Sequence, residues 1–100
     1  MKKITREAIN AFYTPRTDFN KSNTIVEGDL EESKLYLFGN LIAIYNHYRH
    51  ETHISNAGWQ SVTTKERLNG LTGVSIVQRK GDWYLNGELW DGSWVTVENN

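Results

Sequence analysis

The sequence contains no cysteine and a single proline, Pro15, and each scarcity narrows the classes of protein to consider. Without cysteine the chain has no disulfide framework and no thiolate for catalysis or metal binding, which fits a reducing compartment. No apolar run approaches the ~20 residues of a membrane-spanning helix. The start of the chain also lacks the apolar segment of a signal peptide. We therefore expect a soluble, cytoplasmic protein.

An excess of one charge is lacking too, since 11 basic residues face 12 acidic ones and the formal net charge is −1. This balance gives no general attraction to DNA or to an anionic membrane. The chain has no Gly-x-Ser-x-Gly elbow and no glycine-rich nucleotide loop. We therefore expect no enzyme activity and no cofactor, although the sequence alone does not show whether two carboxylates meet in space.

Two polar clusters raise the question of a metal site. His47, His50 and His53 are three residues apart. On a helix this spacing could bring the three side chains together as Zn²⁺ ligands, but on a strand they would alternate between the two faces and could not converge. Their surroundings predict a hairpin, so we expect no metal, and His53 is the one that can face the core. The acidic stretch 27–32 lacks the spacing of a calcium loop and predicts a solvated turn, with an acidic patch for a basic partner as the alternative.

The chain is long enough for one domain, residues 1–100, with its own core. Residues 5–13 have the apolar stripe of an amphipathic helix, with Thr5 as the expected N-cap and Pro15 as the terminator. Phe19, alone in a polar loop, is expected to plug into the core.

Alternating apolar and polar residues predict a series of short strands joined by tight turns. Turn signals are the pairs Gly39-Asn40, Gly81-Asp82, Asn86-Gly87 and Asp91-Gly92, of which Asn86-Gly87 is the strongest. The predicted strands cover residues 24–27, 35–38, 41–45, part of 46–55, 74–78, 83–85, 88–90 and 93–97.

Residues 58–71 separate the two groups of strands and predict a loop, a short helix and a left-handed turn that ends the helix. Thr63 and Glu66 have the spacing of a capping box, and Asn69-Gly70 predicts a left-handed stop. Such a short helix is not stable alone, so it must pack on a sheet, with Trp59 as the expected anchor. The predicted fold is α+β: a mostly antiparallel, meander-like sheet with an N-terminal helix and a short capped central helix.

The start of this central helix is also a candidate anion site, because free N–H groups and the helix dipole favour anions there. Basic residues beside aromatic ones can bind single-stranded nucleic acid, but acidic residues near the C-terminal aromatics outnumber the basic ones. The anion or nucleic-acid candidates are Ser61, Thr63, Thr64, Lys65, Arg67, Arg79 and Lys80.

Aromatic residues make up 12% of the chain and include four tryptophans. In a small sheet Trp commonly fills the core, but Trp and Tyr are also favoured anchors of protein interfaces. The protein-contact candidates are Tyr48, Arg49, Trp90 and Trp94.

Several short motifs together resemble a group of small bacteriophage-encoded proteins. That group has no established activity, so the resemblance assigns no site residues. The motifs are Leu37 to Ala43, Gly58-Trp59, Thr63-Thr64-Lys65, Arg67-Leu68-Asn69 and Trp83 to Gly87.

The resemblance implies a phage protein in the cytoplasm of a bacterial host. We expect a non-enzymatic protein that binds and modulates or inhibits a host protein, such as a defence-system component, a nuclease or a polymerase. The alternative is a nucleic-acid-binding module built on the basic central helix and the aromatic residues. Whether two copies pair through an edge hairpin stays open.

Overall fold

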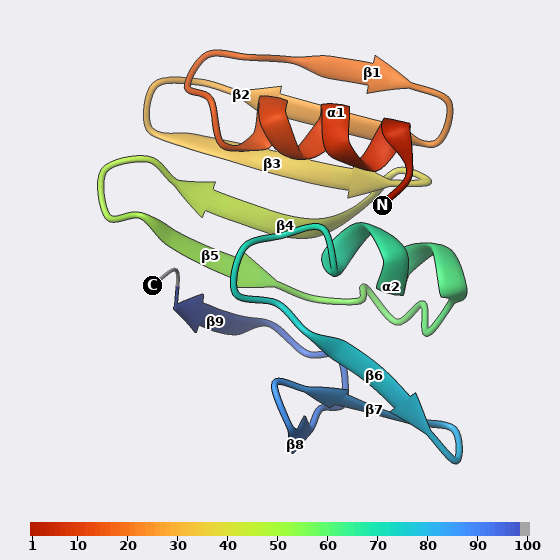
Figure 1. The fold of residues 1–100 in the computed structure, drawn as a ribbon. Helices are drawn as coiled ribbons and strands as arrows, with labels where there is room; N and C mark the ends of the chain where they lie inside the picture. Colours follow the sequence, from red (N-terminus) through yellow and green to blue (C-terminus); the bar gives the residue numbers. More distant parts are fainter. Residues whose placement is uncertain (99–100) are drawn as a thin grey trace.

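The computed structural model describes residues 1–98 as two antiparallel sheets and two helices (Figure 1). The expected α+β class, with a mostly antiparallel sheet and an N-terminal helix, is confirmed. The helices are α1 (Lys3–Phe12) and α2 (Val62–Leu68). The large sheet has the order β1 (Phe19–Lys21), β2 (Thr24–Gly28), β3 (Glu32–Leu37), β4 (Asn40–Asn46), β5 (Glu51–Ile54) and β9 (Val95–Glu98), and the small sheet has the order β6 (Ile76–Arg79), β7 (Asp82–Leu85) and β8 (Glu88–Leu89).

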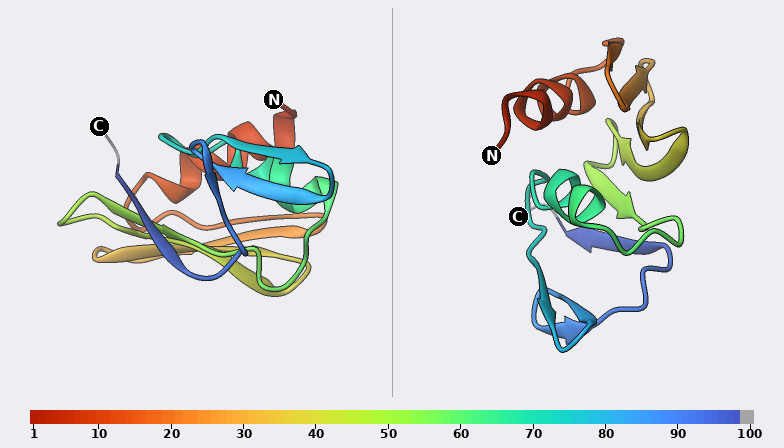
Figure 2. Two further views of the ribbon diagram at one scale, coloured as in Figure 1. Left: turned by 90° about the horizontal axis from the view of Figure 1, so that it is seen from below. Right: turned by 90° about the vertical axis from the view of Figure 1, so that its right-hand side faces the viewer.

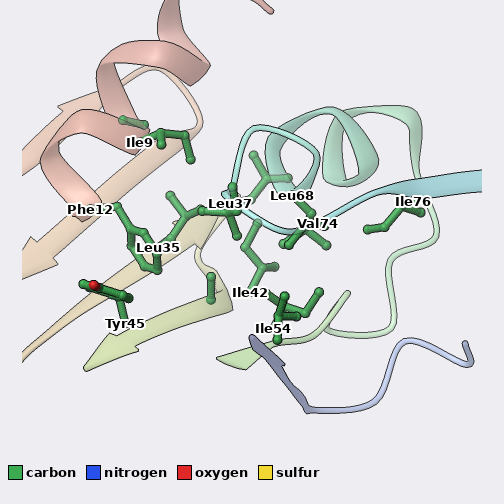
Figure 3. Close-up of a cluster of buried hydrophobic side chains, with 14 of the residues drawn as sticks. Ile9, Phe12, Leu35, Leu37, Ile42, Tyr45, Ile54, Leu68, Val74 and Ile76 are labelled. Carbon is green, nitrogen blue, oxygen red and sulfur yellow. The ribbon is translucent and has the colours of Figure 1, made fainter. Parts of the chain in front are cut away.

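Both helices and the small sheet lie on one face of the large sheet (Figure 2, left view). Alternation in β3 explains why this face is apolar, because Leu35 and Leu37 point inward and are buried while Tyr36 points outward and is half-buried. Phe19 packs against this core, as expected. Figure 3 shows side chains from both helices and both sheets meeting in one cluster: Ile9, Phe12, Leu35, Leu37, Ile42, Tyr45, Ile54, Leu68, Val74 and Ile76.

The helix starts differ from the sequence-based expectation. Thr5 is not the N-cap of α1 but lies inside the helix, is fully buried and donates to Glu66 Oε1 at 2.5 Å. The N-cap of α2 is Ser61, whose Oγ accepts from the backbone N–H of Thr64 at 3.1 Å. Glu66 therefore does not close a capping box with Thr63, because its carboxylate is bound to α1.

The turn between β3 and β4 is one residue earlier than expected. Its two central residues are Phe38 and Gly39, with φ of 49° and 80°, and Asn40 already pairs with Leu37. A two-residue primed turn needs positive φ at both central positions. The predicted Asn86-Gly87 turn has this geometry, with φ of 51° and 90°.

Gly70 is not the left-handed stop that the Asn-Gly pair predicts, because its φ is not positive. Its lack of a side chain serves a close approach instead. A Cβ atom at Gly70 would lie 2.7 Å from Cγ2 of Thr5, so the glycine lets the end of α2 pack against α1.

The chain departs from a meander at its end, because β9 returns to the large sheet and pairs with β5. The small sheet is thus inserted between β5 and β9. Where the chain leaves and re-enters the large sheet, the carbonyl of Gly92 accepts from Ser55 Oγ at 3.0 Å and from the N–H of Asn56 at 2.9 Å. This link holds the loop that leads into α2. Trp94, which directly precedes β9, and Thr96 in β9 are exposed, whereas Val97 is buried, as the alternation predicts.

Candidate functional site

A cleft of about 290 Å³ lies between the β3–β4 turn and the loop that enters α2. Its floor is formed by Leu37 and Ile42, which are buried core residues of β3 and β4. Its aromatic side chains are Phe38 and Trp59. The remaining lining residues are polar and uncharged: Asn40, Asn56, Ser61, Thr63 and Thr64.

Two tight turns hold the aromatic residues of the cleft out in solvent. Phe38 is 68% exposed at its left-handed turn position, and Trp59 is 60% exposed. Trp59 follows a second left-handed pair, Ala57 and Gly58, with φ of 54° and 82°, and its N–H donates to Asn56 O at 2.8 Å. Non-glycine residues at positive φ are strained and cluster at functional sites. The expectation that Trp59 anchors α2 in the core is therefore wrong.

Most polar groups of the cleft are hydrogen-bonded inside the chain. The hydroxyls of Ser61 and Thr64 lie 2.9 Å apart, and Asn56 Oδ1 accepts from the N–H of Gly58 at 2.8 Å. Asn40 Nδ2 lies 3.4 Å from the carbonyl of Phe38. Asn56 is buried, and its amide packs against Gly92. Within residues 1–98, the Thr63 hydroxyl and Asn40 Oδ1 make no hydrogen bond.

The anion candidates do not gather in one place. Ser61, Thr63 and Thr64 line the cleft, whereas Lys65 points to the small sheet and donates to Gln78 Oε1 at 3.3 Å. Arg79 and Lys80 lie at the exposed end of the β6–β7 hairpin.

Arg67 is buried, with 4% of its side chain exposed, and is not part of a basic surface. Its guanidinium donates to Thr24 Oγ1 at 3.1 Å, to Thr5 Oγ1 at 3.0 Å and to the carboxylate of Glu66. Burial alone would raise the pKa of Glu66, but hydrogen bonds from Thr5 and Arg67 outweigh it and lower that pKa. Arg67 thus joins α1, β2 and α2.

The protein-contact candidates divide between surface and core. Tyr48 is 66% exposed and Arg49 is exposed, both at the β4–β5 turn, which is at the opposite end of β4 from Phe38. Trp94 is about half exposed. Trp90 is buried beside Trp83, with ring centroids 6.2 Å apart, and its Nε1 donates to Ser93 O. Its side chain is therefore not available to a partner.

The three histidines have separate partners. Nitrogen atoms of His47, His50 and His53 lie within 2.9 Å of the hydroxyls of Ser33, Tyr45 and Thr96, respectively. Burial lowers the pKa of His47. His53 does not face the core, because it pairs with Ile44 and Thr96 on the uncovered face. Among residues 1–98, no group of three or more His, Cys, Asp or Glu side chains is placed to hold a metal ion.

The sequence analysis did not predict that Phe38 and Trp59 line one cleft. The available signal was a phenylalanine directly before Gly39 in a predicted hairpin, since a turn there exposes whichever side chain it carries. The approach of the two turns joins parts of the chain about twenty residues apart, and no local pattern reports it.

In the described part of the chain, neither helix has the length and apolar character that crossing a membrane requires. Comparison with curated proteins and with solved structures found no match. The sequence model of the family described as Kyanoviridae Gp96 protein matches residues 1–99. This match supports a phage origin and covers nearly the whole chain. The chain therefore belongs to the Kyanoviridae Gp96 family of bacteriophage proteins.

Proposed function

We propose that this phage protein binds a protein of its bacterial host and modulates or inhibits it, in the host cytoplasm and without catalysis of its own. The observation that supports this best is the cleft between Phe38 and Trp59, where two exposed aromatic side chains flank an apolar floor. Aromatic side chains around a pocket are typical of the residues that dominate protein–protein binding energy.

The exposed apolar side chains of the cleft strengthen the proposal. Phe38 and Trp59 are both more than half exposed and line the cleft above the buried Leu37 and Ile42. Apolar surface gathered at one place and rimmed by polar groups marks interaction sites on small proteins. The rim of the cleft supplies such polar groups through its hydroxyl and amide side chains.

The alternative, a nucleic-acid-binding module, has less support. Nucleic-acid binding at physiological salt depends on several cations that face one phosphate backbone. Here Arg67 is buried against Glu66, and Lys65 is turned to the small sheet, where it donates to Gln78, instead of lining the cleft. Of the residues that the structure describes, none of those lining the cleft is a cation.

Affinity capture from a lysate of the bacterial host tests the proposal. The baits are the wild-type protein, the Phe38→Ala/Trp59→Ala double variant and Leu30→Ala, a control at an exposed apolar position in the β2–β3 turn. We expect one host protein that survives nuclease and high salt with the wild type and Leu30→Ala and is lost with the double variant. Recovery of nucleic acid alone, lost at high salt, would instead support the alternative.

A further inference from the structure

We infer that the cleft between Phe38 and Trp59 receives a single uncharged apolar side chain of the partner, aromatic or large aliphatic, together with the peptide group next to it. This inference rests on the proposed function and names the chemistry of the partner segment. Three properties of the cleft carry it: its size, its lack of charge and its small number of free polar groups.

The size of the cleft suits one side chain. Its volume of about 290 Å³ is at the lower limit of small-molecule sites, which span roughly 300–1,000 Å³. Leu37 and Ile42 form a buried floor, so the occupant meets apolar atoms when it enters. An anchor residue that fills such a pocket is the usual centre of a protein interface.

The lack of charge selects a neutral occupant. Among the described residues, those that line the cleft include no Asp, Glu, Lys, Arg or His. A carboxylate, an ammonium group or a phosphate would lose water there without gaining an opposite charge, which is costly. A neutral apolar side chain has no such cost and gains free energy from burial.

The free polar groups match one peptide unit. Asn40 Oδ1 can accept from an N–H, and the Thr63 hydroxyl can donate to a carbonyl; both residues are half-buried, and neither atom has a hydrogen bond within residues 1–98. The base of a nucleotide could also contact the aromatic rings, but its phosphate would meet no cation among the described residues that line the cleft. The geometry therefore favours a peptide segment over a nucleotide.

The backbone holds the cleft open before the partner arrives. Phe38 and Ala57 are both held at positive φ, so both aromatic side chains are displayed without a rearrangement. A preformed site saves part of the entropy that ordering an interface costs.

Nuclear magnetic resonance of the ¹⁵N-labelled protein with small probes, two neutral and two charged, tests this chemistry directly. The neutral probes are N-acetyl-phenylalaninamide and N-acetyl-leucinamide, and the charged probes are the N-acetyl amide of glutamate and adenosine 5′-monophosphate. We expect the first two to shift signals of Gly39, Trp59 and Thr63, with at least tenfold weaker binding to Trp59→Ala and unchanged binding to the control Trp94→Ala. Equal or tighter binding of the glutamate derivative or adenosine 5′-monophosphate, or no shift with any probe, would overturn the inference.

The probe titration and the host capture can fail separately. Probe binding without a captured host protein would leave the chemistry of the cleft in place and remove the proposed function. A host protein captured equally by the wild type and by the double variant Phe38→Ala/Trp59→Ala would keep the function. That result would remove the cleft as the contact.

Discussion

Phe38 occupies a left-handed turn position that suits asparagine or glycine better than phenylalanine. A left-handed backbone costs a non-glycine residue roughly 1–2 kcal/mol, so Phe38 lowers the stability of the fold at this turn. We predict that Phe38→Asn relieves part of this strain and stabilises the protein by about 0.5–1 kcal/mol. This corresponds to a Tm higher by about 2–8 °C, measurable by thermal unfolding followed by circular dichroism.

The same variant should lose host-protein capture, because it removes one of the two aromatic side chains of the cleft. Higher stability of Phe38→Asn together with lost capture would show that the Phe38 side chain serves binding and not folding. A Phe38→Asn protein that is less stable than the wild type would show that the phenyl ring contributes to the fold in spite of its exposure.

His47 gives one source of pH dependence. Burial lowers its pKa in the folded state, whereas the unfolded value is about 6.5. Between the two values the unfolded chain binds more protons, so stability falls as the pH drops below about 6.5. We predict a lower urea midpoint at pH 5.5 than at pH 7.5, and a smaller difference between the two in His47→Gln, whose side chain does not titrate. An equal difference in both proteins would contradict the assignment.

Between elements, Arg67 is the strongest polar connection, since its guanidinium reaches α1, β2 and the neighbouring Glu66. Removing one partner of a buried ion pair costs about 3–5 kcal/mol. Because the Glu66 side chain is 23% exposed and regains some water, we predict a loss of about 2–4 kcal/mol for Arg67→Ala in urea unfolding.

Two further variants test the explanation for Arg67. Arg67→Lys should recover only part of the loss, because an ammonium group cannot reproduce the fork of the guanidinium. Lys65→Ala in the same helix is the matched control and should change stability by less than about 0.5 kcal/mol. If Lys65→Ala lost as much stability as Arg67→Ala, α2 would be sensitive to any substitution and the explanation for Arg67 would be contradicted.

In the molecule as a whole, the two sheets share one hydrophobic cluster. Ile42 and Ile54 of the large sheet belong to it together with Ile76 and Trp83 of the small sheet. The inserted small sheet could not separate without exposing Trp83, which is almost fully buried. Hydrogen bonds from Ser55 and Asn56 to the carbonyl of Gly92 hold the segment before β9 against the segment that follows β5.

We therefore predict one cooperative unfolding transition. The change in tryptophan fluorescence on unfolding comes mainly from Trp83 and Trp90, because these two rings are buried in the folded protein. Far-ultraviolet circular dichroism reports on all the strands and helices. The two probes should give the same urea midpoint, because a two-state protein shows coincident transitions. A fluorescence midpoint at lower urea would indicate that the small sheet unfolds by itself.

Local patterns in the chain were enough to place the helices and most strands. Alternation in β3 and the Asn86-Gly87 pair act over two to four residues, so neighbours in the sequence decide them. The helix caps were less predictable. Thr5 and Glu66 were expected to cap their own helices, but they form a hydrogen bond with each other between α1 and α2. Which aromatic residues are exposed also depends on contacts between distant segments, because packing buries Trp90 and leaves Trp59 in solvent.

Contacts between distant segments decided the rest. The pairing of β9 with β5, the burial of Arg67 and the cleft between Phe38 and Trp59 each join residues about twenty or more positions apart. Such contacts depend on how whole elements pack, and alternation or turn propensity within a segment carries no information about them. The family and the elements could thus be expected from the residues, whereas the candidate site exists only once the two turns meet.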